Sequence, residues 1–298
     1  MKTIIKKLKI LFFRVTLERY PGLYRPSSTP YISGDTFRNL ADHVFDETSS
    51  INPQDVNRLD IVFLNGDLID VYFKTIHKKV RNEYILITHN SDIDISEKEI
   101  ANKDKKIIHW FAQNLVVKAS SDISPIPIGL ENLRRLKYGR RKWYKNQKIK
   151  KNKYIAASYD IYTNYEKRSR IIDKLENNKL VEFVHFSSAK SYFDNITDYK
   201  FAICPSGNGS DTHRIWECFL LGIIPILEIN EFSKNFKEIG LPLFLVNDWS
   251  DLNKLSAEEL NLEYKKLSLQ LNKTQFSSSD FWIKRILLFK SEYISYSY

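Results

Sequence analysis

The sequence predicts an α/β fold built from two successive units, each a parallel sheet with helical crossovers. Three observations predict it. Short β-like runs alternate with helical stretches, a basic polar segment interrupts the alternation at 132–153, and the alternation then restarts. The 298 residues, 43% of them hydrophobic, are enough for two medium-sized domains with complete cores. We place a first domain at 1–135, a second at 150–278 and a C-terminal helix at 279–298.

In the first half of the chain, apolar runs that end at Gly or polar residues predict the strands of a buried sheet. The predicted strands are 58–67, 83–90, 106–112 and 124–130, and the predicted helices are 35–45 and 68–80. The segment 132–153 is rich in Lys and Arg and has little apolar periodicity, so we expect the domain boundary there.

The second half of the chain repeats this pattern. Its predicted strands are 153–159, 180–185, 199–205, 223–227 and 243–246, and its predicted helices are 165–177, 214–221, 256–271 and 280–293. Ligands of parallel sheets bind outside the carboxyl ends of the strands. We therefore expect both sheets to present their loops to a cleft between the domains.

The chain is basic, with a formal net charge of +10. A nucleic acid, an anionic membrane surface or a phosphate-bearing substrate would each explain this excess, as would a Lys-rich surface without a specific partner. Trp143 and Tyr144 lie among the Lys and Arg residues of 134–153. Aromatic residues interleaved with cations are typical of nucleic-acid binding, which keeps that function open as an alternative.

Cys204 and Cys218 are the only cysteines, too few for a disulfide framework and without the CxxC spacing of a zinc site. They predict two buried, reduced thiols in a cytoplasmic protein.

In the basic segment 1–19, the longest uncharged apolar run is 10–13, far short of the roughly twenty residues that span a bilayer. No signal-peptide cleavage site follows. The segment is either a peripheral contact with the membrane surface or a first strand or helix of the domain.

Glycines and charged residues gather at one predicted strand-to-helix turn, within 204–217. Glycines let the backbone approach an anion, and the free N–H groups of a helix start point at it, so this turn suits a phosphate. It lacks the GK[ST] of a P-loop and the GxGxxG of a dinucleotide site, and an ordinary strand-to-helix turn is the alternative. The turn residues are Pro205, Ser206, Gly207, Asn208 and Gly209.

Four ionisable residues follow the turn, namely Asp211, His213, Arg214 and Glu217. Arg214 offers a permanent bidentate donor, which suits a diphosphate. Glu217 lies three positions on, hence on the same helix face, and its carboxylate can accept from both hydroxyls of a ribose. The alternative is a plain salt bridge. The rest of this helix is apolar nearly all round, which favours a binding role.

A second candidate set lies at the start of the second domain. Ser158 ends a predicted strand, Thr163 and Asn164 stand at a helix N-terminus, and Arg168 lies in its first turns. A cation near the positive end of a helix dipole is misplaced unless an anion sits there. We interpret this set as the other half of a diphosphate clamp, with a solvated basic face as the alternative.

These residues carry a resemblance to a known family. Residues 199–226 resemble the donor-site segment of exostosin-like glycosyltransferases, which share an F-x-h-x-P-x-G strand end, an R-x-x-E helix and then G-x-h-P-h. Residues 163–168 are similar to the S/T-N-x-x-x-R segment by which α1,3-fucosyltransferases bind the donor diphosphate. The first half resembles bacterial and viral members of the group in 31–38, 88–92, 110–114 and 127–132.

The resemblance implies two Rossmann-like domains facing a cleft, the GT-B arrangement. The first domain would bind the acceptor, the second the nucleotide-sugar donor, and the C-terminal helix would cross back to the first domain. The implied reaction moves a sugar to a glycan, polysaccharide or lipid-linked saccharide. The membrane anchor and stem of the animal exostosins have no counterpart in this sequence, so we expect action in the cytoplasm, with peripheral membrane contact as an alternative.

An inverting enzyme of this kind needs a general base on the acceptor side. Asp92, Asp35 and His89 each end an apolar run of the first domain, and we rank Asp92 slightly ahead of Asp35. A retaining enzyme would not need such a base, and the sequence leaves the stereochemistry open. Arg214, Arg168 and backbone N–H groups of the turn would stabilise the leaving diphosphate.

No metal ion or other cofactor is expected. Asp92 and Asp94 form a DxD string, but they lie in the half that should not bind the donor, and a basic clamp makes a divalent ion unnecessary. We expect no nucleic-acid partner, because that function would leave the 207–217 stretch unexplained. A catalytically inactive carbohydrate-binding protein of the same fold is the other alternative.

Overall fold

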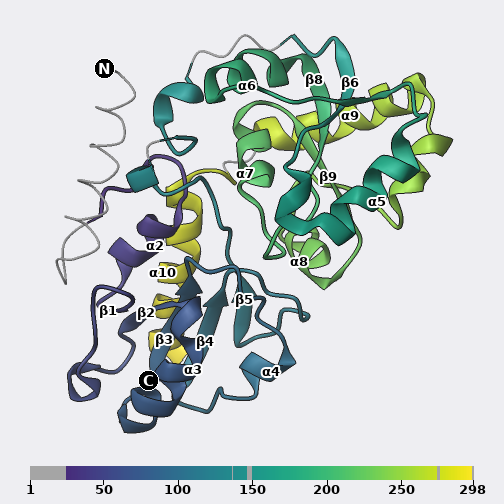
Figure 1. Ribbon diagram of the computed structural model, residues 1–298. Coiled ribbons are helices and arrows are strands. Elements are labelled where there is room, and N and C mark those ends of the chain that lie inside the picture. The colour runs from purple at the N-terminus through teal and green to yellow at the C-terminus, as the bar shows by residue number, and fades with distance from the viewer. Residues whose placement is uncertain (1–24, 136, 146–149, 274–275, 297–298) are drawn as a thin grey trace. The chain divides into compact units, whose positions relative to one another are not determined.

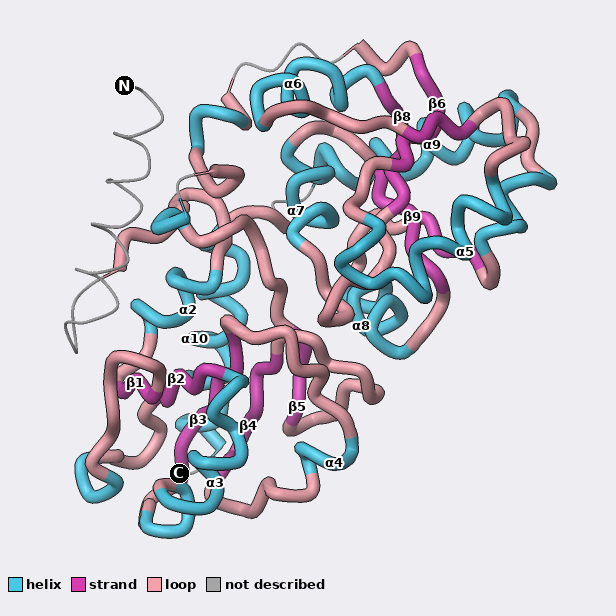
Figure 2. Tube along the Cα trace, viewed as in Figure 1, coloured by secondary structure: helices cyan, strands magenta, loops and turns pink. Residues whose placement is uncertain are grey.

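The structure, a computed structural model, describes residues 25–135, 137–145, 150–273 and 276–296 (Figures 1 and 2). The chain divides into two compact units. The first unit is Met1–Arg140 with Ser278–Tyr298, and the second is Arg141–Ser277. Each unit holds one five-stranded parallel sheet, so the predicted α/β class with a parallel sheet in each half is confirmed.

The first sheet follows the order of the sequence from edge to edge. Its strands are β1 (His43–Phe45), β2 (Ile61–Asn65), β3 (Tyr84–His89), β4 (Ile107–Ala112) and β5 (Ile123–Pro125). Every residue of β2 and β3 is buried, as expected of parallel strands covered on both faces. Their continuous apolar runs made these two strands readable from the sequence.

Two predictions for the first unit were wrong in part. The helix expected at 35–45 ends at Leu40, and His43–Phe45 instead form β1, because Val44 and Phe45 pair in parallel with β2. The strand expected at 124–130 is limited to Ile123–Pro125. Pro125 and Pro127 have no N–H to donate to a neighbouring strand, which explains why the ladder stops there.

Helices complete the first unit. They are α2 (Gly34–Leu40), α3 (Ile69–Thr75), α4 (Glu97–Ile100) and the C-terminal α10 (Ser279–Tyr296). The helix expected at 68–80 is α3 with a 3-10 turn on either side, η2 (Gly66–Leu68) and η3 (His77–Lys79). The backbone N–H of Ser279 donates to Pro30 O at 2.8 Å, and α10 therefore packs within the first unit.

His109 of β4 is buried against α10. The centroid of its ring lies 4.3 Å from that of Phe111 and 4.2 Å from that of Phe289. Burial lowers the pKa of His109 from 6.5 to about 4. As the pH falls, the unfolded chain takes up a proton at this residue near pH 6.5, whereas the folded protein takes it up only near pH 4. The resulting stability is complete above pH 6.5 and is lost between pH 6.5 and 4.

We expect this residue alone to lower the free energy of unfolding by about 3 kcal/mol as the pH falls from 7 to 4. His109→Gln keeps a polar group for Ser124 Oγ, which lies 2.9 Å from the His109 ring, and removes the titration. Urea unfolding at pH 7 and at pH 4.5 should therefore show a smaller acid loss in the variant. An equal loss in both proteins would assign the acid sensitivity to other groups.

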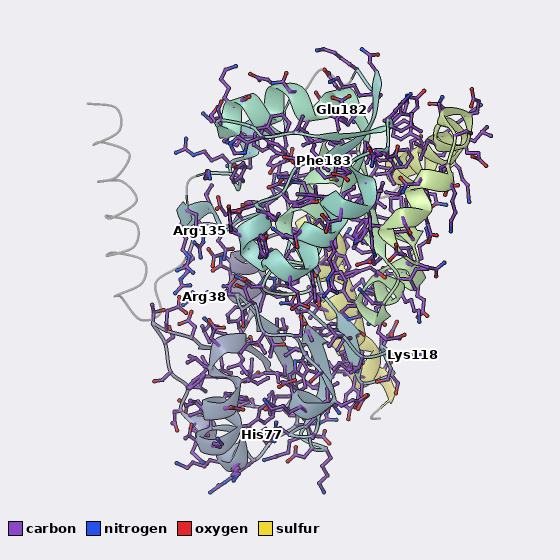
Figure 3. All side chains as sticks on the ribbon, turned by 45° about the vertical axis from the view of Figure 1, so that its right-hand side comes forward. Arg38, His77, Lys118, Arg135, Glu182 and Phe183 are labelled. Carbon is purple, nitrogen blue, oxygen red and sulfur yellow. The ribbon has the colours of Figure 1, made fainter. Side chains whose placement is uncertain are left out.

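The second sheet reverses its strand order. Its strands are β6 (Lys153–Ala157), β7 (Val181–Phe183), β8 (Tyr199–Ile203), β9 (Ile224–Glu228) and β10 (Phe244–Val246). In space the order is β7-β6-β8-β9-β10. The chain runs from β6 out to the edge at β7, where Phe183 is 40% exposed (Figure 3), and returns past β6 to β8. Open α/β sheets bind ligands at such a reversal, outside the carboxyl ends of the strands, and this place at the ends of β6 and β8 is called the crevice below.

Helices cover both faces of the second sheet. They are α5 (Tyr165–Leu175), α6 (Ala189–Asn195), α7 (His213–Leu220), α8 (Glu231–Ile239) and α9 (Ala257–Lys273). α5 and α9 share one apolar core with the strands through Ile171 and Leu260. On the other side, Trp216 of α7 packs on Phe236 of α8, with ring centroids 5.3 Å apart. The short helices α6 and α8 were not predicted.

Three remaining expectations concern the thiols and the membrane. Cys204 and Cys218 are buried and unbridged, with 4.0 Å between their sulfur atoms, which confirms the prediction of two buried thiols. In the described part of the chain, no helix combines the length and the apolar character needed to cross a membrane. The basic segment 1–19 lies outside the described residues.

Candidate functional site

Arg168 of α5 connects the two loops that border the crevice of the second sheet. Its Nε donates to Ser206 O at 3.0 Å, Nη1 to Asp160 O at 2.6 Å and Nη2 to Pro205 O at 3.4 Å. The side chain is buried, and burial lowers the pKa of its guanidinium. Three of its five N–H groups are thus used by backbone carbonyls, and two are left within the described structure.

Asn164 and Thr163 hold the β8–α7 turn from the α5 side. Asn164 caps α5 by accepting from Lys167 N, and its Nδ2 donates to Gly207 O at 2.8 Å. The Thr163 methyl lies 3.4 Å from the position that a Cβ on Gly207 would take. The predicted residues of the second set therefore do meet the predicted turn.

Arg214 of α7 reaches the same crevice from the other face of the sheet. Its Nη1 donates to Ser158 O at 2.8 Å, at the carboxyl end of β6. Its guanidinium lies over the ring of Tyr192, 4.4 Å from the centroid, and its Nε lies 3.3 Å from Glu217 Oε2. The Arg214 side chain is 23% exposed, so a ligand in the crevice can contact it.

Glu217 is nearly buried and is fixed by two partners. Its Oε2 accepts from Tyr192 OH at 2.9 Å and pairs with Arg214, so the salt bridge offered as an alternative is formed. Oε1 has no hydrogen-bond partner among the described residues. One carboxylate oxygen of Glu217 is therefore available to a ligand hydroxyl.

The other predicted residues of this stretch have structural roles or lie at the edge of the site. Asp211 accepts from Trp216 Nε1 at 2.9 Å and is buried, which fixes the first turn of α7. Asn208 is exposed at the tip of the turn, and His213, half-buried, is the first residue of α7. Gly207 N donates to Gly209 O at 3.0 Å. This N–H is used inside the turn, so the predicted backbone cradle for an anion is incomplete, and the arginines are the main donors.

Tyr192 is the residue that sequence reasoning missed in this site. It is buried on α6, a short polar helix with no clear periodicity, and it supports both Arg214 and Glu217. Nothing in its local sequence signals this role, because the contact depends on α6 packing beside α7.

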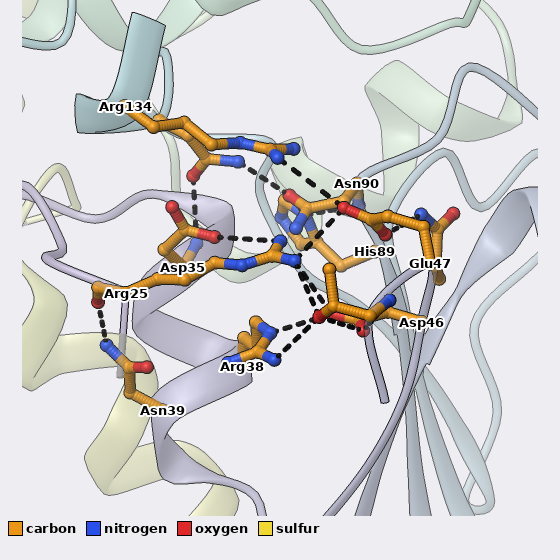
Figure 4. A network of polar contacts seen from close by, with 12 residues as sticks. Arg25, Asp35, Arg38, Asn39, Asp46, Glu47, His89, Asn90 and Arg134 are labelled. Carbon is orange, nitrogen blue, oxygen red and sulfur yellow. Dashed lines mark hydrogen bonds and ion pairs between the residues drawn. The ribbon is translucent and has the colours of Figure 1, made fainter. Parts of the chain in front are cut away.

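A second polar cluster lies in the first unit, at the carboxyl ends of its strands (Figure 4). It contains three arginines and three carboxylates, namely Arg25, Arg38, Arg134, Asp35, Asp46 and Glu47. Arg38 Nε lies 2.7 Å from Asp46 Oδ2, and Arg25 Nη2 lies 3.1 Å from Glu47 Oε1. Asp35 has only a long contact, 4.0 Å from its Oδ1 to Arg25 Nη1.

The three carboxylates of this cluster have different environments. Burial would raise the pKa of Asp46 and of Glu47, but hydrogen bonds, from Arg38 to Asp46 and from Asn65 to Glu47, together with the charge of Arg25, hold both below their usual values. Burial raises the pKa of Asp35 despite the opposing charges of nearby arginines. Among the described residues neither Asp35 oxygen has a hydrogen-bond partner. Asp35 is the carboxylate of this cluster with unused accepting capacity.

His89 and Asn90 at the end of β3 are joined to Asp35 through Asn132. Asn132 Nδ2 donates to Asn90 Oδ1 at 2.9 Å, and its Oδ1 accepts from Asp35 N at 2.8 Å. His89 Nε2 lies 2.9 Å from Pro127 O and therefore carries the proton, while Nδ1 accepts from Asn90 N at 2.6 Å. Both ring nitrogens of His89 are thus engaged. Asp92 is exposed beyond the strand.

Gly34 opens α2 directly against this cluster, and a matched glycine allows a test. A Cβ on Gly34 would lie 1.9 Å from Asn90 Oδ1, whereas one on Gly207 would come no closer than 3.3 Å, to Arg168 Nη2. We expect Gly34→Ala to lower the stability by about 1–3 kcal/mol, because backbone or side chains must shift. Gly207→Ala should cost clearly less. Thermal melts compare the two, and equal melting temperatures would contradict the close packing at Gly34.

Comparison with known proteins adds no assignment, since no family model and no curated protein matches this chain. In the described part of the chain, no group of three or more His, Cys, Asp or Glu residues is placed to hold a metal ion. The fold and the site thus define the protein by class: an α/β protein with two parallel sheets, in which two arginines meet at the carboxyl ends of β6 and β8 of the second sheet.

Proposed function

We propose that the protein is a glycosyltransferase of the GT-B type, with a nucleotide-sugar donor on the second unit and an acceptor on the first. One observation carries the proposal: Arg168 and Arg214 meet, from helices on opposite faces of the second sheet, at the ends of β6 and β8, where the strand order reverses. Open α/β sheets bind ligands at such points. Two guanidinium groups there suit the diphosphate of a nucleotide-sugar.

In the proposed reaction, the bond between the sugar C1 and the diphosphate oxygen breaks, a bond forms between C1 and an acceptor oxygen, and the proton of that acceptor hydroxyl passes to a general base. Negative charge grows on the leaving diphosphate, and the partly exposed Arg214 stabilises it. Glu217 Oε1 accepts a hydrogen bond from a ribose hydroxyl. The arginines supply the positive charge, so the proposal requires neither a metal ion nor another cofactor.

The proposal assigns the general base to Asp35 ahead of Asp92 and His89, which reverses the order suggested by the sequence. Asp35 has a raised pKa and free accepting capacity, while Asp46 and Glu47 beside it have lowered pKa values. Carboxylates whose environments push their pKa values apart are typical of acid–base sites. Solvent reaches none of the Asp35 side chain, so an acceptor hydroxyl meets it only after a neighbouring side chain moves.

The acceptor that we propose is a glycan, a polysaccharide or a lipid-linked saccharide. The nucleic-acid alternative loses its main support, because the aromatic residues of the basic segment are used in packing. Trp143 stacks on Phe193 at 5.2 Å between ring centroids, and Tyr144 is buried against the same ring. Both rings are therefore engaged in packing within the second unit.

A thermal-shift panel of UDP, GDP, CMP and their sugars tests the proposal. A nucleotide that binds only the folded protein raises the melting temperature by mass action, by an amount that depends on its concentration relative to Kd. We expect one base class to stand out, and hydrolysis or transfer of its sugar to follow. A flat panel would contradict donor binding. Binding without any turnover would favour the inactive carbohydrate-binding alternative.

A further inference from the structure

Two tyrosines beside the donor crevice are far more exposed than their size would lead one to expect. Tyr162 is 82% exposed and Tyr165 is 61% exposed. Their rings stack on each other, with centroids 6.2 Å apart and planes inclined by 18°. Within the described structure their side chains make no other ring contact and no hydrogen bond. Paired exposed aromatic rings with no packing role indicate a binding surface.

In the sequence, the two tyrosines flank the residues that contact the β8–α7 turn. Tyr162 lies in the 3-10 turn η6 (Ile161–Asn164), and Tyr165 is the first residue of α5. Between them lie the two residues that contact the turn: Thr163, 3.4 Å from the Cβ position of Gly207, and Asn164, bonded to Gly207 O. Tyr162 and Tyr165 therefore directly flank, along the chain, the two residues that contact the turn.

The inference rests on the proposed function, which fixes the direction of the donor. In that proposal Glu217, held in place by Tyr192, binds the ribose on the α7 side of the crevice, whereas Tyr162 and Tyr165 lie on the α5 side. A diphosphate that links ribose and sugar across the crevice carries its sugar to the α5 side. We propose that Tyr162 and Tyr165 form a platform on which the transferred sugar ring of the donor stacks.

The chemistry of the two rings fits this ligand. One face of a pyranose exposes mainly C–H groups, and covering it with an aromatic ring removes apolar surface from water. The phenol hydroxyls of Tyr162 and Tyr165 can also exchange hydrogen bonds with sugar hydroxyls. The platform therefore adds affinity for the sugar and leaves the nucleotide part of the donor to Arg214 and Glu217.

Isothermal titration of nucleoside diphosphates and their sugars separates these contributions. The probes are UDP with UDP-glucose and GDP with GDP-mannose, and the pair that binds the wild-type protein is used. In the Tyr162→Ala/Tyr165→Ala variant we expect the affinity for the nucleotide-sugar to fall roughly twofold to tenfold per ring. The affinity for the nucleoside diphosphate should stay unchanged. Tyr162→Phe/Tyr165→Phe should retain most of the sugar affinity, since stacking needs only the ring.

A matched control is Leu262→Ala on α9, because Leu262 is 69% exposed in the same unit. It should change neither affinity, and none of the three variants should lower the melting temperature noticeably, since their side chains are exposed. An equal loss of affinity for the nucleoside diphosphate and for the nucleotide-sugar would indicate that the two rings contact the nucleotide part. Unchanged affinities would show that they do not contact the donor. A raised KM for the acceptor alone would assign them to the acceptor. Each of these outcomes overturns the proposal.

Failure of the proposed function itself is distinguishable. In that case the wild-type protein binds none of the nucleotides and nucleotide-sugars of the thermal-shift panel, and the proposal of a sugar platform fails as well. Where the wild-type protein binds a nucleoside diphosphate, the comparison of variants decides on the platform alone.

Discussion

Arg214→Ala is expected to reduce sugar transfer roughly 10²- to 10³-fold, the cost of removing one preorganised donor to a developing negative charge. Arg214 contacts both Ser158 O and Glu217. Its loss therefore removes a hydrogen-bond donor to the diphosphate and also leaves the Glu217 carboxylate without its ion-pair partner. Steady-state kinetics with the donor identified by the nucleotide panel measure the effect, and the melting temperature of the variant shows whether it folds.

Two further variants make this result specific. Arg214→Lys keeps the charge but loses the bidentate geometry, and we expect an intermediate loss. Arg170→Ala on α5 is the matched control, because Arg170 is exposed and, among the residues that the structure describes, forms an ion pair only with Glu166, 2.9 Å away. If Arg170→Ala lowered the rate of sugar transfer as much as Arg214→Ala, the effect would come from the loss of positive charge in general. That result would contradict a specific contact of Arg214 with the diphosphate.

Asp35→Asn is expected to lower kcat roughly 10²- to 10⁴-fold, as removal of a general base does, with little change in donor affinity. Asp35 can accept a proton only when it is ionised, and its pKa lies above the usual value. In the wild-type protein, kcat should therefore rise with pH through this raised pKa. The variant should show no such rise. Asp92→Asn, at an exposed carboxylate of the same unit, should leave kcat nearly unchanged.

The stability of Asp35→Asn distinguishes a base from a structural carboxylate. Because the folded pKa of Asp35 is raised, the folded protein binds more protons than the unfolded chain between the usual pKa of 3.8 and the raised value. Stability at this residue therefore falls as the pH rises through that window. The neutral amide avoids this cost, so we expect the melting temperature at pH 7 to be equal or higher. A strongly lowered melting temperature together with lost activity would favour a structural role.

Sequence patterns predicted much of the fold because the decisive signals were local. β2 and β3 are runs of mostly apolar residues, as parallel strands buried on both faces require. Charged residues beside helix starts in the second half pointed to Arg168 and Arg214, and both do lie at the crevice. Of the missed helices, α6 is short and largely polar, whereas α8 did carry local signals, since Asn230 caps it, Phe232 and Phe236 lie one turn apart and Gly240 ends it.

The sequence by itself determined the α/β class, the two parallel sheets and the arginines of the crevice, because each depends on the order of residues along one short segment. Only the tertiary structure decided what depends on distant segments meeting. The reversal of strand order beside β6 arises from pairing between strands far apart in the chain. Tyr192 of α6 bonds to Glu217 of α7. Asp35 differs in its pKa from Asp46 and Glu47, because arginines from three segments pair closely with those two carboxylates and leave the Asp35 oxygens without hydrogen bonds.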